Sequence, residues 1–324
     1  MMHSLRKKYF PRAASRQTGV ALVQVLLVFA ILVTIAAQLG FRQRLTISGT
    51  QEMLERGQAR AWLYSVEALA LAELSRDYES PLPEEYWGEW SDVFDLDPGE
   101  ATFKLQTLEN RYNLNWLHPE SGVEEAPAQV TRLLQNQGAD TAWVQRLNDW
   151  FDRESGAEFE YRVVEPGYRP SFQPLVDASE LRLLMPQVIP LSELALDDWA
   201  TFLPPDSQIY LPSISRALFN ALHADLGDEH WAALEAALAD GMEAPEDWLA
   251  AEVMEPLQGQ IPTGWFTLQK QYFLLEAEVT YLNYTLWITS WIYRDPDGNM
   301  QVYQRHFIPM DTPPKPEEDE TDDE

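Results

Sequence analysis

The stretch VALVQVLLVFAILVTIAA, from Val20 to Ala37, is the apolar segment that decides the fold. Only Gln24 and Thr34 interrupt it. An α-helix rises 1.5 Å per residue, so this segment spans about 27 Å, close to the roughly 30 Å hydrocarbon core of a bilayer. The sequence therefore predicts a single helix that crosses a membrane.

The segment that precedes the apolar run is basic. Residues 1–19 contain five basic residues and no acid: Arg6, Lys7, Lys8, Arg12 and Arg16. Basic flanks stay in the cytoplasm, so we expect a cytoplasmic N-terminus, with the bulk of the chain beyond the inner membrane in the periplasm. An ordinary secretory signal has a shorter apolar region and then a small-x-small cleavage site, which this sequence lacks.

The helical pattern continues beyond the membrane segment. Apolar residues recur at helical spacing at Ala59, Trp62, Val66, Leu69 and Leu74, until Pro81 and Pro83 stop the pattern. We therefore predict one long helix from about Val20 to Tyr78, embedded in lipid at first and amphipathic afterwards.

Composition excludes several classes of function. The 324 residues carry 23 Lys and Arg against 52 Asp and Glu, a formal net charge of -29. Such a chain repels phosphate backbones, so nucleic-acid binding is not expected. The absence of cysteine excludes disulfides, iron–sulfur clusters, thiolate zinc sites and cysteine nucleophiles. The closing PKPEEDETDDE has seven acids and predicts a disordered tail.

The sequence predicts an antiparallel sheet interrupted by helices. Apolar residues alternate in ATFKLQTL, Ala101 to Leu108, which predicts the first strand. Aromatic and β-branched residues dominate 266–282 and 284–293, and the turn Asp295–Asn299 precedes a last strand, Val302 to Ile308. A helical region from Ala126 to Trp150 lies between the first strand and the others.

No catalytic constellation is found in the sequence. It lacks H-E-x-x-H, G-x-S-x-G and a Walker-type glycine loop. His223 and His230 flank three acids, but two helical turns separate them, too far for one ion. We expect most tryptophans to pack in the core rather than to stack on sugars or bases; they are Trp87, Trp90, Trp143, Trp150, Trp199, Trp231, Trp248, Trp265, Trp287 and Trp291.

The N-terminal segment resembles the type IV pilin family. The matching residues are Arg16-Gln17-Thr18-Gly19 followed by Val20-Ala21-Leu22-Val23. The resemblance implies that a prepilin peptidase cuts between Gly19 and Val20 and methylates Val20. Most pilins carry a glutamate at the fifth mature position, where this chain has Gln24, and the lack of that glutamate is typical of the minor pseudopilin K family of type II secretion systems.

Motifs in the soluble part resemble the same family. They are QARAWLYSVEALALAEL (Gln58–Leu74), NRYNLNWL (Asn110–Leu117), and D-W-x-D, G-A-E, Y-R-P and L-x-x-x-S-E-L-R within Leu147–Leu184. The resemblance implies an α+β pilin-like fold, in which the long N-terminal helix packs on a small antiparallel sheet and a large, mainly helical domain follows the first strand. The expected segments are a leader (1–19), a transmembrane part (20–41), a first pilin-like part (42–119), the insertion (120–262), C-terminal strands (263–312) and the tail (313–324).

The resemblance also implies a role in secretion. The chain is expected to be a non-enzymatic component at the tip of a pseudopilus, supporting protein secretion across the outer membrane. Its expected partners are the minor pseudopilins I and J, with H, the prepilin peptidase and the inner membrane. The alternative is a membrane-anchored periplasmic binding protein or hydrolase with an uncleaved signal anchor.

Calcium is the one ion that the resemblance suggests, although no cofactor is required. Asp152 and Glu158 occupy matching motif positions and are the expected ligands, because calcium favours carboxylate oxygens on loops. A solvated acidic loop is the alternative. The start of an EF-hand calcium loop is matched by Asp295, Asp297 and Asn299. The twelfth position of that loop requires a glutamate, and this chain has His306 there. We therefore expect a hairpin turn at this segment.

Overall fold

The computed structural model describes residues 18–83, 86–184, 196–282 and 284–308. The chain divides into two units, Met1–Arg60 and Ala61–Glu324, and the boundary falls within the first helix. Most of the predicted leader, part of the insertion and the whole acidic tail lie outside the described residues.

The predicted long helix is confirmed as α1, Thr18–Glu79. The hydroxyls of Thr34, Thr46 and Thr50 donate to the carbonyl four residues earlier, so these polar groups are satisfied inside the helix. The helix ends just before Pro81 and Pro83, because proline has no N–H to continue the ladder.

The C-terminal strands and two strands that precede the insertion form a five-stranded antiparallel sheet in the order β1-β2-β7-β8-β9. The strands are β1 (Phe94–Asp95), β2 (Glu100–Thr107), β7 (Tyr272–Tyr281), β8 (Tyr284–Arg294) and β9 (Met300–Ile308). The predicted strand from Phe266 is broken: β6 (Phe266–Thr267) pairs in parallel with β5 (Ile209–Tyr210) instead. The aromatic residues of this segment fit a strand, but the sequence does not reveal which other strand pairs with it.

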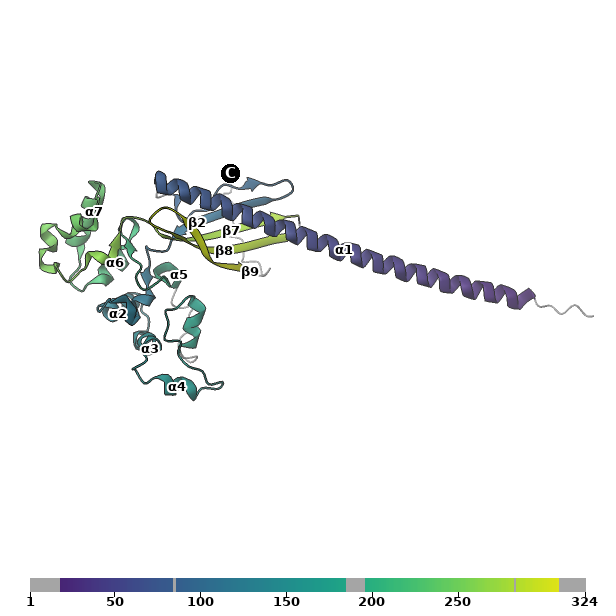
Figure 1. The fold of residues 1–324 in the computed structure, drawn as a ribbon, viewed down its shortest axis with the longest axis horizontal. Helices are drawn as coiled ribbons and strands as arrows, with labels where there is room; N and C mark the ends of the chain where they lie inside the picture. The colour runs from purple at the N-terminus through teal and green to yellow at the C-terminus, as the bar shows by residue number, and fades with distance from the viewer. Residues whose placement is uncertain (1–17, 84–85, 185–195, 283, 309–324) are drawn as a thin grey trace, which may run out of the picture. The chain divides into compact units, whose positions relative to one another are not determined.

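The part of α1 after Arg60 covers one face of the sheet, where its blue end lies across β2, β7 and β8 (Figure 1). Leu63, Val66 and Leu74 are buried in a cluster with residues of the inner face, such as Phe103 and Leu275; we call it the sheet cluster. The predicted apolar face was partly wrong. Leu69 is 38% exposed, and Trp62 is only partly buried at the margin of the cluster. Apolar residues spaced three and four positions apart lie on neighbouring faces of a helix, and the spacing alone does not show which of these faces is buried.

The insertion leaves the sheet after β2 and returns at β7, where the Leu108 N–H donates to the Tyr272 carbonyl at 3.0 Å. Its helices are α2 (Ala126–Asn136), α3 (Ala142–Phe151), α4 (Glu158–Arg162), α5 (Leu196–Trp199), α6 (Arg216–Leu222), α7 (Asp228–Ala239) and α8 (Pro245–Leu249). The predicted helical region from Ala126 to Trp150 is thus two helices, separated at Gly138, whose φ of 67° ends the first.

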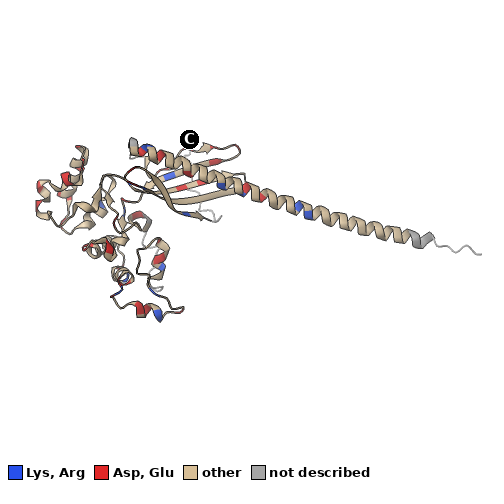
Figure 2. Cartoon of the chain, in the orientation of Figure 1, with Lys and Arg blue, Asp and Glu red and all other residues tan. Residues whose placement is uncertain are grey.

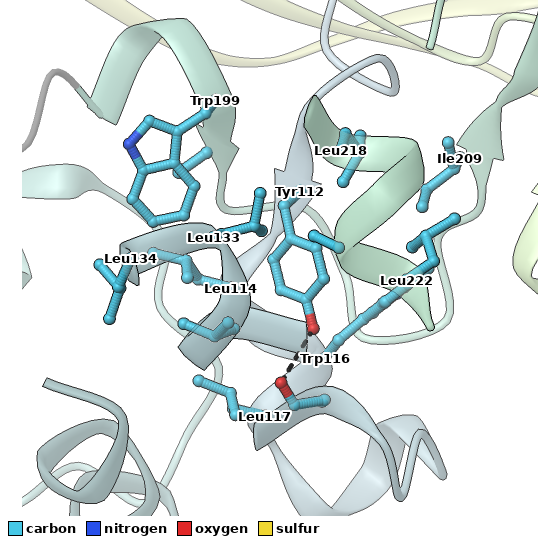
Figure 3. Packing of buried hydrophobic residues seen from close by; sticks show 14 of the residues in the cluster. Tyr112, Leu114, Trp116, Leu117, Leu133, Leu134, Trp199, Ile209, Leu218 and Leu222 are labelled. Atoms are coloured by element: carbon cyan, nitrogen blue, oxygen red, sulfur yellow. Dashed lines mark hydrogen bonds between the residues drawn. The ribbon is translucent and has the colours of Figure 1, made fainter. Parts of the chain in front are cut away.

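The buried side chains of the insertion form a second cluster, the insertion cluster, which runs from Tyr112 to Phe266. Tyr112 lies in the middle of it (Figure 3). The Tyr112 hydroxyl donates to Gln129 Oε1, a residue that the figure does not draw, at 3.0 Å. The cluster begins before residue 120 and ends after residue 262. Residues 112–117 therefore pack with the insertion rather than with the sheet.

Two buried asparagines explain the N-L-N motif. Asn113 accepts a hydrogen bond from the Leu203 N–H and donates to Ser207 Oγ, at 3.1 and 2.9 Å. Asn115 exchanges two hydrogen bonds of 2.7 Å with the backbone of Leu175. These amides satisfy loop backbone groups that would otherwise be buried unpaired, and they hold three distant segments together.

Candidate functional site

The first unit presents an exposed apolar surface. Within the described residues, α1 contains the one helix segment apolar enough to cross a membrane, and none of that segment is buried. The side chains from Leu22 to Leu39 are exposed Leu, Val, Ile and Phe residues, with few polar residues between them. Such a surface is stable against lipid or other apolar helices, and every backbone group is satisfied within the helix.

The predicted processing residues lie at the start of this helix. Gly19 and Val20 fall within the first turn of α1, which begins at Thr18. Gln24 is exposed on the apolar surface and carries no charge into lipid. Cleavage and methylation at this position remain predictions from the resemblance.

A buried carboxylate joins α1 to the far strands of the sheet. Glu67 is only 4% exposed; it accepts a hydrogen bond of 2.5 Å from Ser290 Oγ on β8. Arg305 on β9 donates to both oxygens of Glu67, from Nε at 2.9 Å and from Nη2 at 2.9 Å. This bidentate contact restrains α1 against rotation about its own axis on the sheet.

A buried ion pair holds the last turn of α1. Arg294 donates from Nη1 to Asp77 Oδ2 at 3.0 Å and to the Leu74 carbonyl at 3.2 Å. Its Nη2 donates to the Lys270 carbonyl at 2.6 Å, and the guanidinium lies 4.8 Å from the Phe273 ring. The arginine satisfies one carbonyl of α1 and one of the segment before β7 as well as the carboxylate, which offsets the cost of burying both charges.

Glu109 lies where the chain passes from the sheet into the insertion. It is 1% exposed, and its Oε2 accepts from the N–H groups of Gln271 and Tyr272, at 2.6 and 3.0 Å. Burial raises the pKa of Glu109 to about 7, although these two hydrogen bonds and the nearby Arg294 and Lys270 lower it in part. Glu109, Glu67 and Arg294 were not predicted as site residues, and the one local signal was the charge of Glu67 within the apolar pattern of its helix.

The structure does not assemble the predicted calcium ligands into a coordination site. Asp152 Oδ1 accepts from the Glu154 N–H at 2.8 Å at the end of α3. Glu158 Oε1 accepts from Arg162 at 2.6 Å and lies 3.1 Å from Arg169 Nε. Among the described residues there is no group of three His, Asp or Glu side chains that could hold a metal ion. Asp152 and Glu158 each offer carboxylate oxygens, the donor type that calcium prefers, and calcium binding here stays a prediction.

The two histidines cap separate helices. His223 ends α6 and its Nδ1 accepts from the Asp225 N–H, whereas His230 lies in α7 and its Nδ1 accepts from the Gly227 N–H, both at 3.2 Å. Our assumption of a single helix was wrong, because His223 and Gly227 both have extended backbone conformations. The Asp295–Asn299 hairpin is confirmed, and both Asn299 N and Asp297 N donate to Asp295 Oδ1.

The tryptophans divide between core and surface. Trp143, Trp150, Trp199, Trp248 and Trp265 are buried, as predicted. Trp287 and Trp291 are half-buried on the sheet face opposite α1, and Trp90 is 41% exposed beside Trp287. The prediction of core packing was therefore wrong for these three, since aromatic residues suit both faces of a strand.

Charge over the described residues is mainly acidic. Figure 2 shows more Asp and Glu than Lys and Arg on the inserted helices, in agreement with the net charge of -29. Such a surface offers no attraction to a phosphate backbone.

Comparison with known proteins gives matches over most of the chain. Residues 110–204 match the family model described as "Type II secretion system (T2SS), protein K". The chain is 28% identical over 294 residues to the type II secretion system protein K of Klebsiella pneumoniae, covering 82% of this chain and 88% of that protein. It is 29% identical over 314 residues to the Pseudomonas aeruginosa protein of the same name, covering 89% and 92%.

The fold also matches a solved structure. A chain in the crystal structure of the GspK-GspI-GspJ complex from the enterotoxigenic Escherichia coli type II secretion system aligns with a TM-score of 0.63. The sequence identity is 21%, and the alignment covers 80% of this chain and 98% of that chain. At this identity the match establishes the shared fold.

Proposed function

We propose a function that starts from one premise: this chain is a relative of type II secretion system protein K, as its N-terminal and soluble motifs predicted. The pilin-like α+β fold is likewise confirmed. The chain works as a minor pseudopilin, a structural subunit that inserts through α1 and assembles with other pseudopilins to support protein secretion.

The observation that carries this proposal is the exposed apolar part of α1. The helix is long enough to cross a bilayer and continues without a break into the pilin-like unit. Its exposed side chains, from Leu22 to Leu39, can exchange lipid for the apolar helices of neighbouring subunits. In this arrangement the basic leader stays in the cytoplasm and the folded domains lie in the periplasm.

The proposed partners are the counterparts of minor pseudopilins I and J, with H beyond them. In the similar crystal structure, GspI and GspJ are the companions of the GspK chain. The same fold and the same apolar helix support an equivalent assembly here. The prepilin peptidase would act on the chain before assembly, at the peptide bond between Gly19 and Val20.

We place the subunit at the tip of the pseudopilus. The insertion enlarges the unit well beyond the sheet and α1, and a terminal position accommodates such bulk because no subunit stacks above it. Gln24 agrees with this position: a neutral side chain need not pair with the terminal amine of a subunit ahead of it.

The alternative is a membrane-anchored binding protein or hydrolase with an uncleaved anchor. Within the described residues, the buried carboxylates Glu67, Asp77 and Glu109 are tied into structural contacts, and His223 and His230 lie at helix ends. The proposal of a non-enzymatic role rests on these contacts and on the family resemblance.

The decisive experiment is a mass measurement of the N-terminus in cells with and without the prepilin peptidase. We expect a chain that starts at a methylated Val20 when the peptidase is present. Gly19→Val should leave the leader uncut and reduce secretion to the level of a deletion strain, because the peptidase requires the small residue before the cut.

Gly40→Val is the matched control. It lies in the same helix, and an added Cβ there meets no other atom within 4 Å. The control chain should be cut as the native chain is. An N-terminus upstream of Val20 in peptidase-positive cells would contradict the proposal and favour the anchored enzyme.

A further inference from the structure

An open pocket of about 390 Å³ lies between the edge of β2 and the loop 86–92. The loop is held along this edge by two backbone hydrogen bonds of 2.7 Å, from Gly88 N to the Leu105 carbonyl and from Ser91 N to the Phe103 carbonyl. The pocket therefore has a defined wall on each side.

The pocket combines an aromatic lining with two carboxylates. Tyr86, Trp90 and Phe103 supply rings, and the exposed Glu89 and Asp92 supply the acids. Among the described residues, no lysine or arginine lines the pocket. Within the described part of the chain, neither carboxylate takes part in an ion pair or a side-chain hydrogen bond.

The same loop already binds cations of this chain on its aromatic rings. Lys270 Nζ lies 4.0 Å from the centre of the Trp87 ring, and Lys104 Nζ lies 5.8 Å from the Trp90 ring. Lys104 also pairs with Glu276 at 3.2 Å. On the helix side, Arg76 pairs with Glu73 at 2.6 Å. Lys270 and Arg76 are thus engaged with groups outside the pocket lining, whereas Lys104 lies over the pocket ring Trp90 with its charge paired to Glu276.

We propose that the pocket binds an arginine or lysine side chain presented by a partner protein. Rings attract a cation through their faces, and the carboxylates add charge-assisted hydrogen bonds at the opening. A neutral apolar ligand would desolvate Glu89 and Asp92 without replacing their hydrogen bonds, and an anion would be repelled. Charge complementarity therefore selects a basic segment as the occupant.

The inference is independent of the proposed function. It requires only the sheet and the loop, both of which lie in the second unit. A basic segment could dock here whether or not the chain is processed and assembled as a pseudopilin.

The test uses the full chain in non-ionic detergent at 150 mM salt. The probe is the peptide Gly-Ser-Arg-Ser-Gly carrying a photoreactive diazirine, and cross-linked residues are mapped by mass spectrometry. We expect adducts concentrated between Tyr86 and Leu105, competition by the unlabelled peptide, and no such adducts from the peptide in which Gln replaces Arg.

Charge-neutral variants separate the pocket from general attraction to an acidic protein. The double variant Glu89→Gln with Asp92→Asn should reduce the yield of these adducts about fivefold, the effect of losing two exposed ion pairs. The control combines Glu235→Gln on α7 with Asp240→Asn at the C-cap of that helix; it changes the net charge equally and should leave the yield unchanged. Equal losses in both variants, equal labelling by the Gln peptide, or adducts spread over the surface would each overturn the proposal.

Discussion

At the scale of single residues, Glu109 is the least expected feature. It is a carboxylate buried at the junction between the sheet and the insertion, and its Oε1 has no hydrogen-bond partner among the residues that the structure describes. Oε2 accepts hydrogen bonds from two backbone N–H groups, and these bonds offset part of the cost of burying the carboxyl group. The charged and titratable groups that influence it are Arg294 and Lys270, with Tyr272 and Tyr303 beside them.

Glu109 predicts a pH dependence of stability. Its folded pKa of about 7 lies above the ordinary value of 4.5, so the folded chain binds this proton more tightly than the unfolded chain. The stabilising contribution is complete below pH 4.5 and is lost as the pH rises through 7, a loss of about 3 kcal/mol. In Glu109→Gln, the free energy of unfolding should change less between pH 5 and pH 8.

Denaturant unfolding of the full chain in non-ionic detergent at several pH values checks this prediction. Glu235→Gln, an exposed acid on α7, is the control and should follow the native profile. Parallel pH profiles for Glu109→Gln and the native chain would show that Glu109 is already ionised at pH 5 in the folded state.

At the scale of elements, the important contact is that of α1 with the sheet. Apolar burial attaches the helix to the sheet, and two ion pairs add directional contacts between them. Glu67 and Asp77 each meet an arginine of the sheet, Arg305 and Arg294. These pairs determine which face of α1 meets the sheet, and hence which side remains available to partners.

Glu67→Ala should therefore weaken this contact. It leaves Ser290 without its acceptor and Arg305 without its bidentate partner, at a cost of about 2 to 3 kcal/mol in the free energy of unfolding. Glu52→Ala, which removes an exposed pair with Arg56 on the same helix, should cost less than about 0.5 kcal/mol.

Hydrogen exchange localises this effect. Amides of α1 after Arg60, together with those of β8 and β9, should exchange faster in Glu67→Ala than in the native chain. Equal loss of stability in the Glu52→Ala control would mean that burial of Glu67 has no special role.

At the scale of the second unit, the buried side chains form two separate clusters. The sheet cluster contains residues of α1 and the strands, whereas the insertion cluster runs from Tyr112 to Phe266. The chain enters and leaves the insertion at neighbouring points, since Leu108 and Tyr272 are hydrogen-bonded. The insertion is therefore attached as a long loop between two adjacent strands.

This arrangement predicts that the pilin-like part survives removal of the insertion. Replacing residues 110–269 with a short glycine-rich turn should leave β2 and β7 as a hairpin and keep the Arg294 contacts to Asp77 and the Lys270 carbonyl. Cooperative thermal unfolding, followed by circular dichroism, is the expected result. Loss of cooperativity would show that the sheet depends on the insertion, whose residues Val176 and Phe202 approach Leu274 and Trp291 on its outer face.

Local patterns were sufficient for the long helix and the first strand, and the processing site predicted from them stays a prediction. The apolar run predicted α1, and alternation in Ala101–Leu108 predicted β2 within one residue. The processing motif at Gly19 and the substitution at Gln24 are also local. The ion pairs could not be predicted in the same way, because Glu67 and Arg305 are 238 positions apart and many other acids and bases were available as partners.

The sequence by itself determined a membrane-spanning helix, an acidic chain without cysteine, strands at the C-terminus and the family resemblance, because each depends on neighbouring residues or on composition. Only the tertiary structure decided which face of α1 meets the sheet, that residues 112–117 pack with the insertion, that Glu158 is bound by arginines, and that Glu109 is buried. These outcomes depend on packing between distant segments, where the burial of one group is set by what covers it.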